Sequence, residues 1–218
     1  MLDVADIYAP DAFAARVRER FASRADILAA TGGDHALNPT FEPELRRRTF
    51  KPAAVLIGVR DDGGTARVVL TQRTEHLSAH SGQVAFPGGR LDEGEDAVSA
   101  ALREAHEEIG LPARDADVLG TFGTYYSGSG YAIAPVVAML RGAPDLTPNP
   151  DEVADIFEVP LAFLMDQACH RLESRHWKGQ ERFFYTMPYD DDGRERRIWG
   201  VTAGIIRMVQ ERLYGTAR

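Results

Sequence analysis

Runs of apolar residues along the chain predict a series of β-strands. AAVLIGV (53–59) and ARVVLTQ (66–72) are separated by the turn sequence DDGG and predict a β-hairpin. RFFYTMPY (182–189) and RRIWG (196–200) predict a second hairpin around DDDG. Other apolar runs predict three further strands: QVAF (83–86), TFGTYY (121–126) and YAIAPVVAML (131–140). The last two lie on either side of a glycine-rich SGSG loop.

Near the start of the chain, apolar residues recur at helical spacing. Residues 10–29 place Phe13, Val17 and Phe21 on one stripe, which predicts an amphipathic helix. Such a stripe suits either packing within the chain or an interface in a homodimer, and the pattern leaves both open.

The later part of the chain alternates between strand and helix patterns. Residues 95–109 have helical spacing, and ADIFEVP (154–160) predicts a strand that continues into a helix with Pro160 in its first turn. A last helix is expected from near Thr202 to Gly215, because glycine commonly follows helix ends. This order predicts an α/β fold, with a mixed sheet covered by helices.

Composition narrows the classes of function. The chain has 218 residues, 44% of them hydrophobic, which suits one domain with a substantial core. No apolar run is long enough to span a membrane, and we expect no membrane partner. A net charge of −8 disfavours nucleic-acid binding, so a polyanionic ligand would need a cation or a local basic cluster. A single cysteine, Cys169, and no basic leader before the first apolar residues favour the cytoplasm.

The predicted helix at 95–109 carries an unusual concentration of acidic residues. Projected at helical spacing, its core-facing stripe consists of Val98, Ala101, Leu102, Ala105 and Ile109. Glu104, Glu107 and Glu108 gather on one flank of this stripe, with the small residues Ala97 and Ala100 leaving an open stretch beside them. Like charges at this spacing destabilise a helix by about 0.2–0.5 kcal/mol per pair, so the cluster calls for compensation.

The acidic cluster has two interpretations. In the first, it is a solvated surface that Arg103 partly neutralises. In the second, it binds a metal, because clustered carboxylate oxygens are preferred ligands of hard divalent cations, and Mg²⁺ also takes oxygens from substrate phosphates. Gly88 and Gly89 precede the helix, and glycine allows close approach of a backbone or ligand. We favour a site where a cation joins protein carboxylates to a phosphate-containing ligand.

The spacing of these residues resembles the Nudix box, G-x5-E-x7-R-E-U-x-E-E-x-G-U, where U is usually a bulky aliphatic residue. In this chain it reads Gly89-x5-Glu95-x7-Arg103-Glu104-Ala105-x-Glu107-Glu108-x-Gly110-Leu111, with all seven fixed positions present and only Ala105 departing. The resemblance covers about residues 50–215. It implies the Nudix fold, an α/β/α sandwich around a mixed β-sheet, at residues 50–218. Residues 1–49 lie outside the resemblance, and their helical pattern predicts a helical extension.

The resemblance also implies a chemistry. Members of this family hydrolyse a nucleoside diphosphate linked to another group, with Mg²⁺ or Mn²⁺ as cofactor. Carried over by position, the metal ligands would be Glu104, Glu107, Glu108 and the carbonyl of Gly89. Arg103 would orient a catalytic glutamate, and Glu95 would fix the loop through polar contacts.

The catalytic base is left open by the motif. The loop PNPDEV contains Glu152, which we favour as a catalytic or metal-binding residue, with Glu104 as the alternative. His76, His80 and His106 offer a weaker zinc hypothesis that lacks a fourth ligand at suitable spacing. A serine nucleophile is not supported, since the chain has no G-x-S-x-G turn.

Residues 69–89, VLTQRTEHLSAHSGQVAFPGG, are similar to the accessory signature of the coenzyme A pyrophosphatase branch, roughly LLTxR-[SA]-x3-R-x3-G-x3-FPGG. Two positions depart: Thr74 replaces Ser or Ala, and Ser78 replaces an arginine, which puts affinity for coenzyme A in doubt. The implied products are 3′,5′-ADP and 4′-phosphopantetheine. The alternatives are ADP-ribose, NADH or a nucleoside triphosphate as substrate, or a ligand-binding Nudix protein with little turnover.

Coenzyme A carries a 3′-phosphate besides its pyrophosphate, so cationic contacts are expected. Arg73 is the first candidate, because a guanidinium can bind phosphate through two hydrogen bonds. Arg90 follows the double glycine, and Phe86 belongs to the FPGG motif. Tyr125, in the loop before SGSG, is expected to pack on the adenine or the pantetheine arm.

Overall fold

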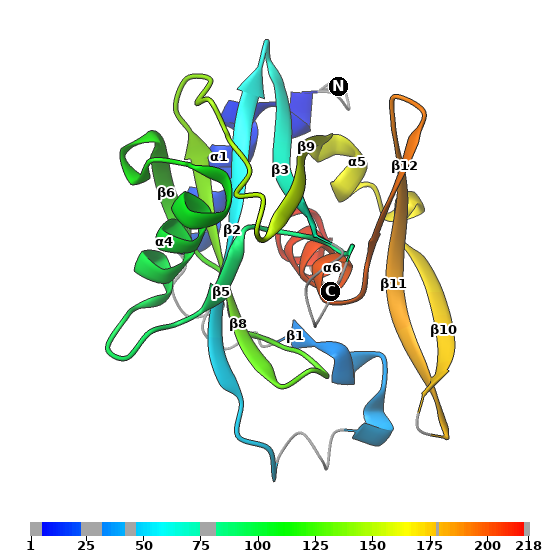
Figure 1. Cartoon of the computed structure of the whole chain (residues 1–218). Coiled ribbons are helices and arrows are strands. Elements are labelled where there is room, and N and C mark those ends of the chain that lie inside the picture. Colours follow the sequence, from blue (N-terminus) through cyan, green and yellow to red (C-terminus); the bar gives the residue numbers. More distant parts are fainter. Residues whose placement is uncertain (1–5, 23–31, 42–46, 75–81, 178, 216–218) are drawn as a thin grey trace.

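The computed structural model describes residues 6–22, 32–41, 47–74, 82–177 and 179–215. Within these ranges the strands form one large mixed sheet and one small antiparallel sheet (Figure 1). The large sheet contains β1 (Gly32–Gly33), β2 (Lys51–Asp62), β3 (Thr65–Arg73), β4 (Val84–Ala85), β5 (Gly88–Arg90), β6 (Ala116–Thr121), β7 (Tyr125–Tyr126), β8 (Tyr131–Leu140) and β9 (Val153–Pro160). The small sheet contains β10 (Arg171–Trp177), β11 (Gln180–Asp191) and β12 (Arg194–Trp199).

Strand β2 lies in the middle of the large sheet. It pairs antiparallel with β3, which confirms the predicted hairpin, and parallel with β8. Side chains alternate along the strand, so Ile57 and Val59 enter one core while Ala54 and Leu56 enter another. Because both faces of the sheet are covered, the apolar run in β2 is continuous rather than alternating.

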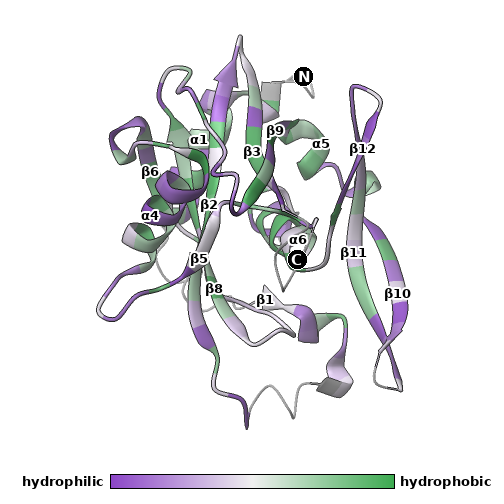
Figure 2. Ribbon diagram, in the orientation of Figure 1, coloured by the Kyte–Doolittle hydropathy of each residue, from purple (hydrophilic) through white to green (hydrophobic). Residues whose placement is uncertain are grey.

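Helices cover both faces of the large sheet, as predicted. Helix α4 (Ala97–Ile109) packs on the core that contains Leu56. The opposite face is covered by α1 (Pro10–Ala22), α5 (Leu161–Met165) and α6 (Gly200–Tyr214) (Figure 1). Much of α6 and β3 is hydrophobic, whereas β10 is largely hydrophilic (Figure 2). Among the described residues, no helix is long and apolar enough to cross a membrane.

The stripe on α1 packs within the chain. Phe13 and Val17 are fully buried in the same core as α6, and Nη1 of Arg16 donates a hydrogen bond to the carbonyl of Leu213 at 3.0 Å. These two side chains are therefore not available for a dimer interface. The helix ends at Ala22, and the rest of the predicted helix, residues 23–29, lies outside the described residues. The division between an extension at 1–49 and a domain at 50–218 stays a prediction.

Two strand predictions differ from the structure. The run 121–126 is not one strand: β6 ends at Thr121, and Phe122 turns into the core before β7 begins at Tyr125. The pairing with β8 shifts between Val118 and Gly120, which breaks the regular alternation. Strand β10 was not predicted, because its side chains are mostly exposed on both faces and leave no apolar period to detect.

Candidate active site

Helix α4 begins and ends at residues suited to those positions. The side chain of Asp96 accepts a hydrogen bond from the backbone N–H of Ser99 at 2.9 Å, and Gly110 ends the helix in the left-handed region at φ 68°. Ala100 and Ala105 are fully buried, so the helix lies close to the sheet. The sequence predicted an open stretch at Ala97 and Ala100, and this is wrong at Ala100, because the helix face toward the sheet includes that residue.

Glu108 is buried between α4 and the large sheet. It is 2% exposed, and its Oε2 accepts a hydrogen bond from the backbone N–H of Gly88 at 3.2 Å. Its Oε1 lies 3.4 Å from Nη1 of Arg73. Burial raises the pKa of Glu108 to about 7, although Arg73 and the Gly88 N–H both favour the charged form. This carboxylate is thus poised to gain or lose a proton near neutrality.

Glu104 lies directly against Gly89. A β-carbon at position 89 would overlap with the Glu104 carboxylate, so only glycine allows this approach. Burial raises the pKa of Glu104, and the nearby charges of Glu107 and Glu152 raise it further, while Arg103 opposes them. The carboxylate is thus held beside the backbone of β5 among other acidic groups.

Arg103 joins the helix to the loop before it. Its Nε and Nη2 donate to the two oxygens of Glu95 at 3.0 and 2.9 Å, and Nη2 also donates to the carbonyl of Arg90 at 3.0 Å. Its Nη1 contacts Glu104 at 3.0 Å and Glu107 at 3.2 Å. The hydrogen bond from Arg103 is the main cause of the lowered pKa of Glu95. The structure therefore brings together the two residues expected to orient a glutamate and fix the loop.

The donor set suits a hard divalent cation. The loop of Glu152 is attached to α4, because the N–H of Asn149 donates to the carbonyl of Glu108 at 2.9 Å and the N–H of Glu152 donates to the carbonyl of Asn149 at 3.1 Å. The charge of Glu152 contributes to the raised pKa of both Glu104 and Glu108. In the described part of the chain, no three His, Cys, Asp or Glu side chains converge into a ready-made metal site. Arg103 holds Glu104 and Glu107, while Arg73 holds Glu108, so binding a cation requires these side chains to shift. Burial disfavours the charged forms of Glu104 and Glu108 and so raises their pKa. A bound Mg²⁺ or Mn²⁺ would stabilise these charged forms.

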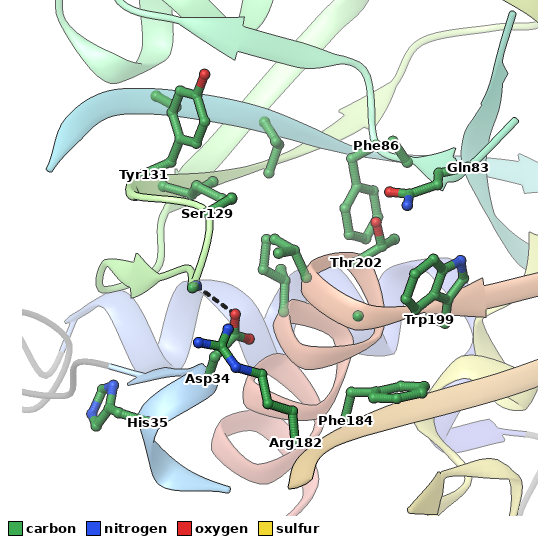
Figure 3. Close-up of a pocket in the computed structure, with 18 of the residues that line it drawn as sticks. Asp34, His35, Gln83, Phe86, Ser129, Tyr131, Arg182, Phe184, Trp199 and Thr202 are labelled. Atoms are coloured by element: carbon green, nitrogen blue, oxygen red, sulfur yellow. Dashed lines mark hydrogen bonds between the residues drawn. The ribbon is translucent and has the colours of Figure 1, made fainter. Parts of the chain in front are cut away.

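A cleft of about 1140 Å³ opens beside Gly88 and Gly89 and is bounded on its far side by the small sheet (Figure 3). Among the described residues that line it, Asp34 is the one acidic residue. The arginines that line it are Arg47, Arg48, Arg73, Arg90, Arg175 and Arg182. In a chain with a net charge of −8, this concentration of positive charge favours an anionic ligand.

The predicted substrate contacts fall in different places. Arg73 and Arg90 line the cleft, and Phe86 lies at its wall while only 4% exposed. Tyr125 does not reach the cleft surface: it is 4% exposed, and its hydroxyl donates to Oδ1 of Asp34 at 2.5 Å. The expectation for Tyr125 is corrected accordingly, since strand β7 turns this ring inward to pack in the core. Residues 75–81, with Ser78, His76 and His80, lie outside the described residues.

Sequence reasoning missed the cleft's second wall. Trp177 and Arg175 on β10, Phe184 on β11 and Trp199 on β12 all line it. A signal was present in RLESRHW, where period-two spacing puts Arg175 and Trp177 on one face of a strand. It was hidden because apolar and polar residues are mixed on both faces of this segment, so neither face has an apolar period.

Known proteins of one family are similar to this chain. The NUDIX domain family matches residues 49–187. The chain is 39% identical over 163 residues to Nudix hydrolase 15, mitochondrial, of Arabidopsis thaliana, covering 72% of this chain and 57% of that protein, less than two thirds of its length. It is 38% identical over 172 residues to the uncharacterized Nudix hydrolase NudL of Escherichia coli K12, covering 76% and 85% of the two chains.

Among solved structures, the Nudix hydrolase RenU from M. smegmatis is similar with 31% identity and a TM-score of 0.45, covering 51% of this chain and 71% of that one. The family match spans more than half of the chain and includes α4 with all of its glutamates. Nudix hydrolases generally use divalent metal ions, in keeping with the carboxylates gathered beside Gly89. The chain therefore belongs to the Nudix hydrolase family.

Proposed function

We propose that this protein hydrolyses the pyrophosphate of coenzyme A or a coenzyme A derivative with the help of Mg²⁺ or Mn²⁺. The observation that carries the proposal is the position of two α4 carboxylates, Glu104 against Gly89 and Glu108 against Gly88, at the edge of an arginine-lined cleft. The accessory signature at residues 69–89 supports coenzyme A over other nucleoside diphosphates. The single cysteine suits the cytoplasm as its location.

The residues have separate roles in this proposal. Glu104, Glu107 and Glu108, with the Gly89 carbonyl, would hold the cation, which would supply charge neutralisation at the phosphoryl oxygens and an activated water. Arg103 keeps Glu104 in place through its links to Glu95. Glu152 is the candidate that accepts the proton of the attacking water. The water oxygen bonds to phosphorus as the bridging P–O bond breaks, releasing 3′,5′-ADP and 4′-phosphopantetheine.

Product analysis by chromatography tests this proposal. The protein is incubated with coenzyme A, ADP-ribose, NADH and dATP in parallel, each with Mg²⁺, with Mn²⁺ and with EDTA. We expect metal-dependent release of 3′,5′-ADP from coenzyme A at the highest kcat/KM. Faster cleavage of another compound would keep the chemistry and change the substrate. Tight binding of coenzyme A without cleavage in either metal would favour the binding-protein alternative.

A further inference from the structure

One face of the small sheet contributes arginine and aromatic side chains to the lining of the cleft. In the strand pairing, Arg175 lies opposite Arg182, and Thr186 lies opposite Trp199. Side chains at paired positions share a face of a sheet, as do residues two apart. The cleft-lining residues of this face, called here the arginine–tryptophan face, are Arg175, Trp177, Gln180, Arg182, Phe184 and Trp199.

The charged and aromatic groups of this face are interleaved. The guanidinium carbon of Arg182 lies 4.1 Å from the centre of the Trp177 ring, and that of Arg175 lies 5.5 Å from the centre of the Trp199 ring. Phe184 packs edge-on against Trp199, with ring centres 5.6 Å apart. Figure 3 shows Arg182, Phe184 and Trp199 around the same space, across from Phe86. Stacking on Trp199 restricts the guanidinium group of Arg175, which is exposed and can still present its N–H edge to an anion.

The arginines of the cleft form groups on different walls. Arg73 and Arg90 belong to the large sheet, next to Gly88 and Gly89, where the pyrophosphate is proposed to bind. Arg175 belongs to the small sheet, on the opposite wall. Like charges gathered in one cleft repel each other, and a ligand with a single anionic group at Gly89 would not relieve the repulsion on the far wall. Two basic walls therefore suit a ligand with two separate anionic groups.

We infer that the arginine–tryptophan face binds the nucleotide end of the substrate, with Arg175 holding a phosphate monoester distinct from the pyrophosphate that is cleaved. The aromatic side chains provide apolar surfaces for the base. This inference rests on the proposed function for the orientation of the substrate. Binding to the face itself can be tested without metal and without turnover.

The two tryptophans of the chain, Trp177 and Trp199, both lie on this face. Tryptophan fluorescence therefore reports on the face directly. The full-length protein is titrated in EDTA with 3′,5′-ADP, with 5′-AMP and with adenosine. We expect both nucleotides to change the fluorescence, and 3′,5′-ADP to bind about tenfold more tightly than 5′-AMP, since it offers an additional charge-assisted contact. The Trp177→Phe and Trp199→Phe variants show which ring carries the change.

Arg175→Gln should remove most of the tenfold preference. Arg171→Gln is the matched control, because Arg171 is an exposed arginine on the same strand that is not part of the cleft lining. With metal present, Arg175→Gln should raise KM for coenzyme A with little change in kcat, and should leave KM for dephospho-coenzyme A unaltered.

Equal affinities for 3′,5′-ADP and 5′-AMP, a fluorescence that neither nucleotide changes, or equal effects of Arg175→Gln and Arg171→Gln would overturn the inference. Failure of the proposed function looks different. In that case, in EDTA, the unaltered protein still prefers 3′,5′-ADP to 5′-AMP and the Arg175→Gln variant does not. Coenzyme A, however, is not cleaved with either metal. Conversely, cleavage of coenzyme A with an unaltered KM in Arg175→Gln would retain the function and reject the face.

Discussion

Nη1 of Arg73 lies 3.4 Å from Oε1 of Glu108, which joins the wall of the cleft to the most buried carboxylate of α4. The Glu108 side chain is 3% exposed and that of Arg73 is 24% exposed. Sequence alone suggested a phosphate contact for Arg73. The structure adds a second role, because this cation favours the charged form of Glu108 and so affects how readily the site accepts a metal.

Arg73→Ala should move the pKa of Glu108 above its value of about 7, since the attraction that favours the carboxylate is removed. We expect the acidic limb of the kcat/KM profile for coenzyme A to move to higher pH, and Arg73→Lys to restore it in part. Arg67→Ala, on the same strand but paired with Asp62 and Glu158, is the control. An equal loss at every pH would show that Arg73 acts through the substrate alone.

Stability should depend on pH through Glu108 in the metal-free protein. The folded-state pKa of about 7 lies above the ordinary 4.5, so the folded state holds a proton that the unfolded chain releases. This contribution is fully present below the unfolded value and is lost as pH rises through about 7. Its upper limit is about 3 kcal/mol.

Denaturant unfolding in EDTA from pH 5 to 8 measures this loss, and we expect Glu108→Gln to flatten the curve. The difference between the two proteins should grow with pH over that range. Parallel curves would show that Glu108 is not the group responsible.

Gly89→Ala should displace the Glu104 carboxylate, with which the added methyl group overlaps. Gly89 does not have a positive φ, so the effect comes from the contact rather than from backbone strain. We expect kcat/KM to fall by about 10²-fold or more, as for a misplaced catalytic group. Gly58→Ala is the control, because its nearest atoms, on Leu140, are at 3.4 Å. Equal activity of the two variants would contradict the importance of this approach.

Glu104→Gln or Glu108→Gln should lower turnover by several orders of magnitude and leave the fold intact. The amide keeps the shape of each side chain and removes the charge that binds a cation. Steady-state kinetics measures the loss of turnover, and circular dichroism checks that the fold is intact. Glu93→Gln is the control, because Glu93 is exposed in the loop before α4. Near-normal activity in both variants would remove the metal-site argument.

Glu152→Gln tests the identity of the base. If Glu152 accepts the proton of the attacking water, kcat should fall while KM for coenzyme A and the metal dependence of the rate change little. An altered metal dependence would instead assign Glu152 to cation binding. Unchanged kinetics would leave Glu104 as the candidate.

Local patterns were sufficient for much of the fold. The hairpin of β2 and β3, strand β8 and helix α4 were predicted within a few residues, because each depends on the period of its own side chains. The break between β6 and β7 was missed, since it depends on how Phe122 packs in the core. Strand β10 was missed because its stability comes from pairing with β11 rather than from an apolar face.

The sequence by itself determined the set of carboxylates on α4, since offsets of three and four residues put Glu104, Glu107 and Glu108 on neighbouring positions of any helix. Only the tertiary structure decided that Glu108 meets Arg73 across 35 positions of the chain, that Tyr125 turns inward, and that the small sheet bounds the cleft. Helical spacing is a property of adjacent residues. Contacts between distant segments depend on how whole elements pack, which no short stretch of sequence encodes.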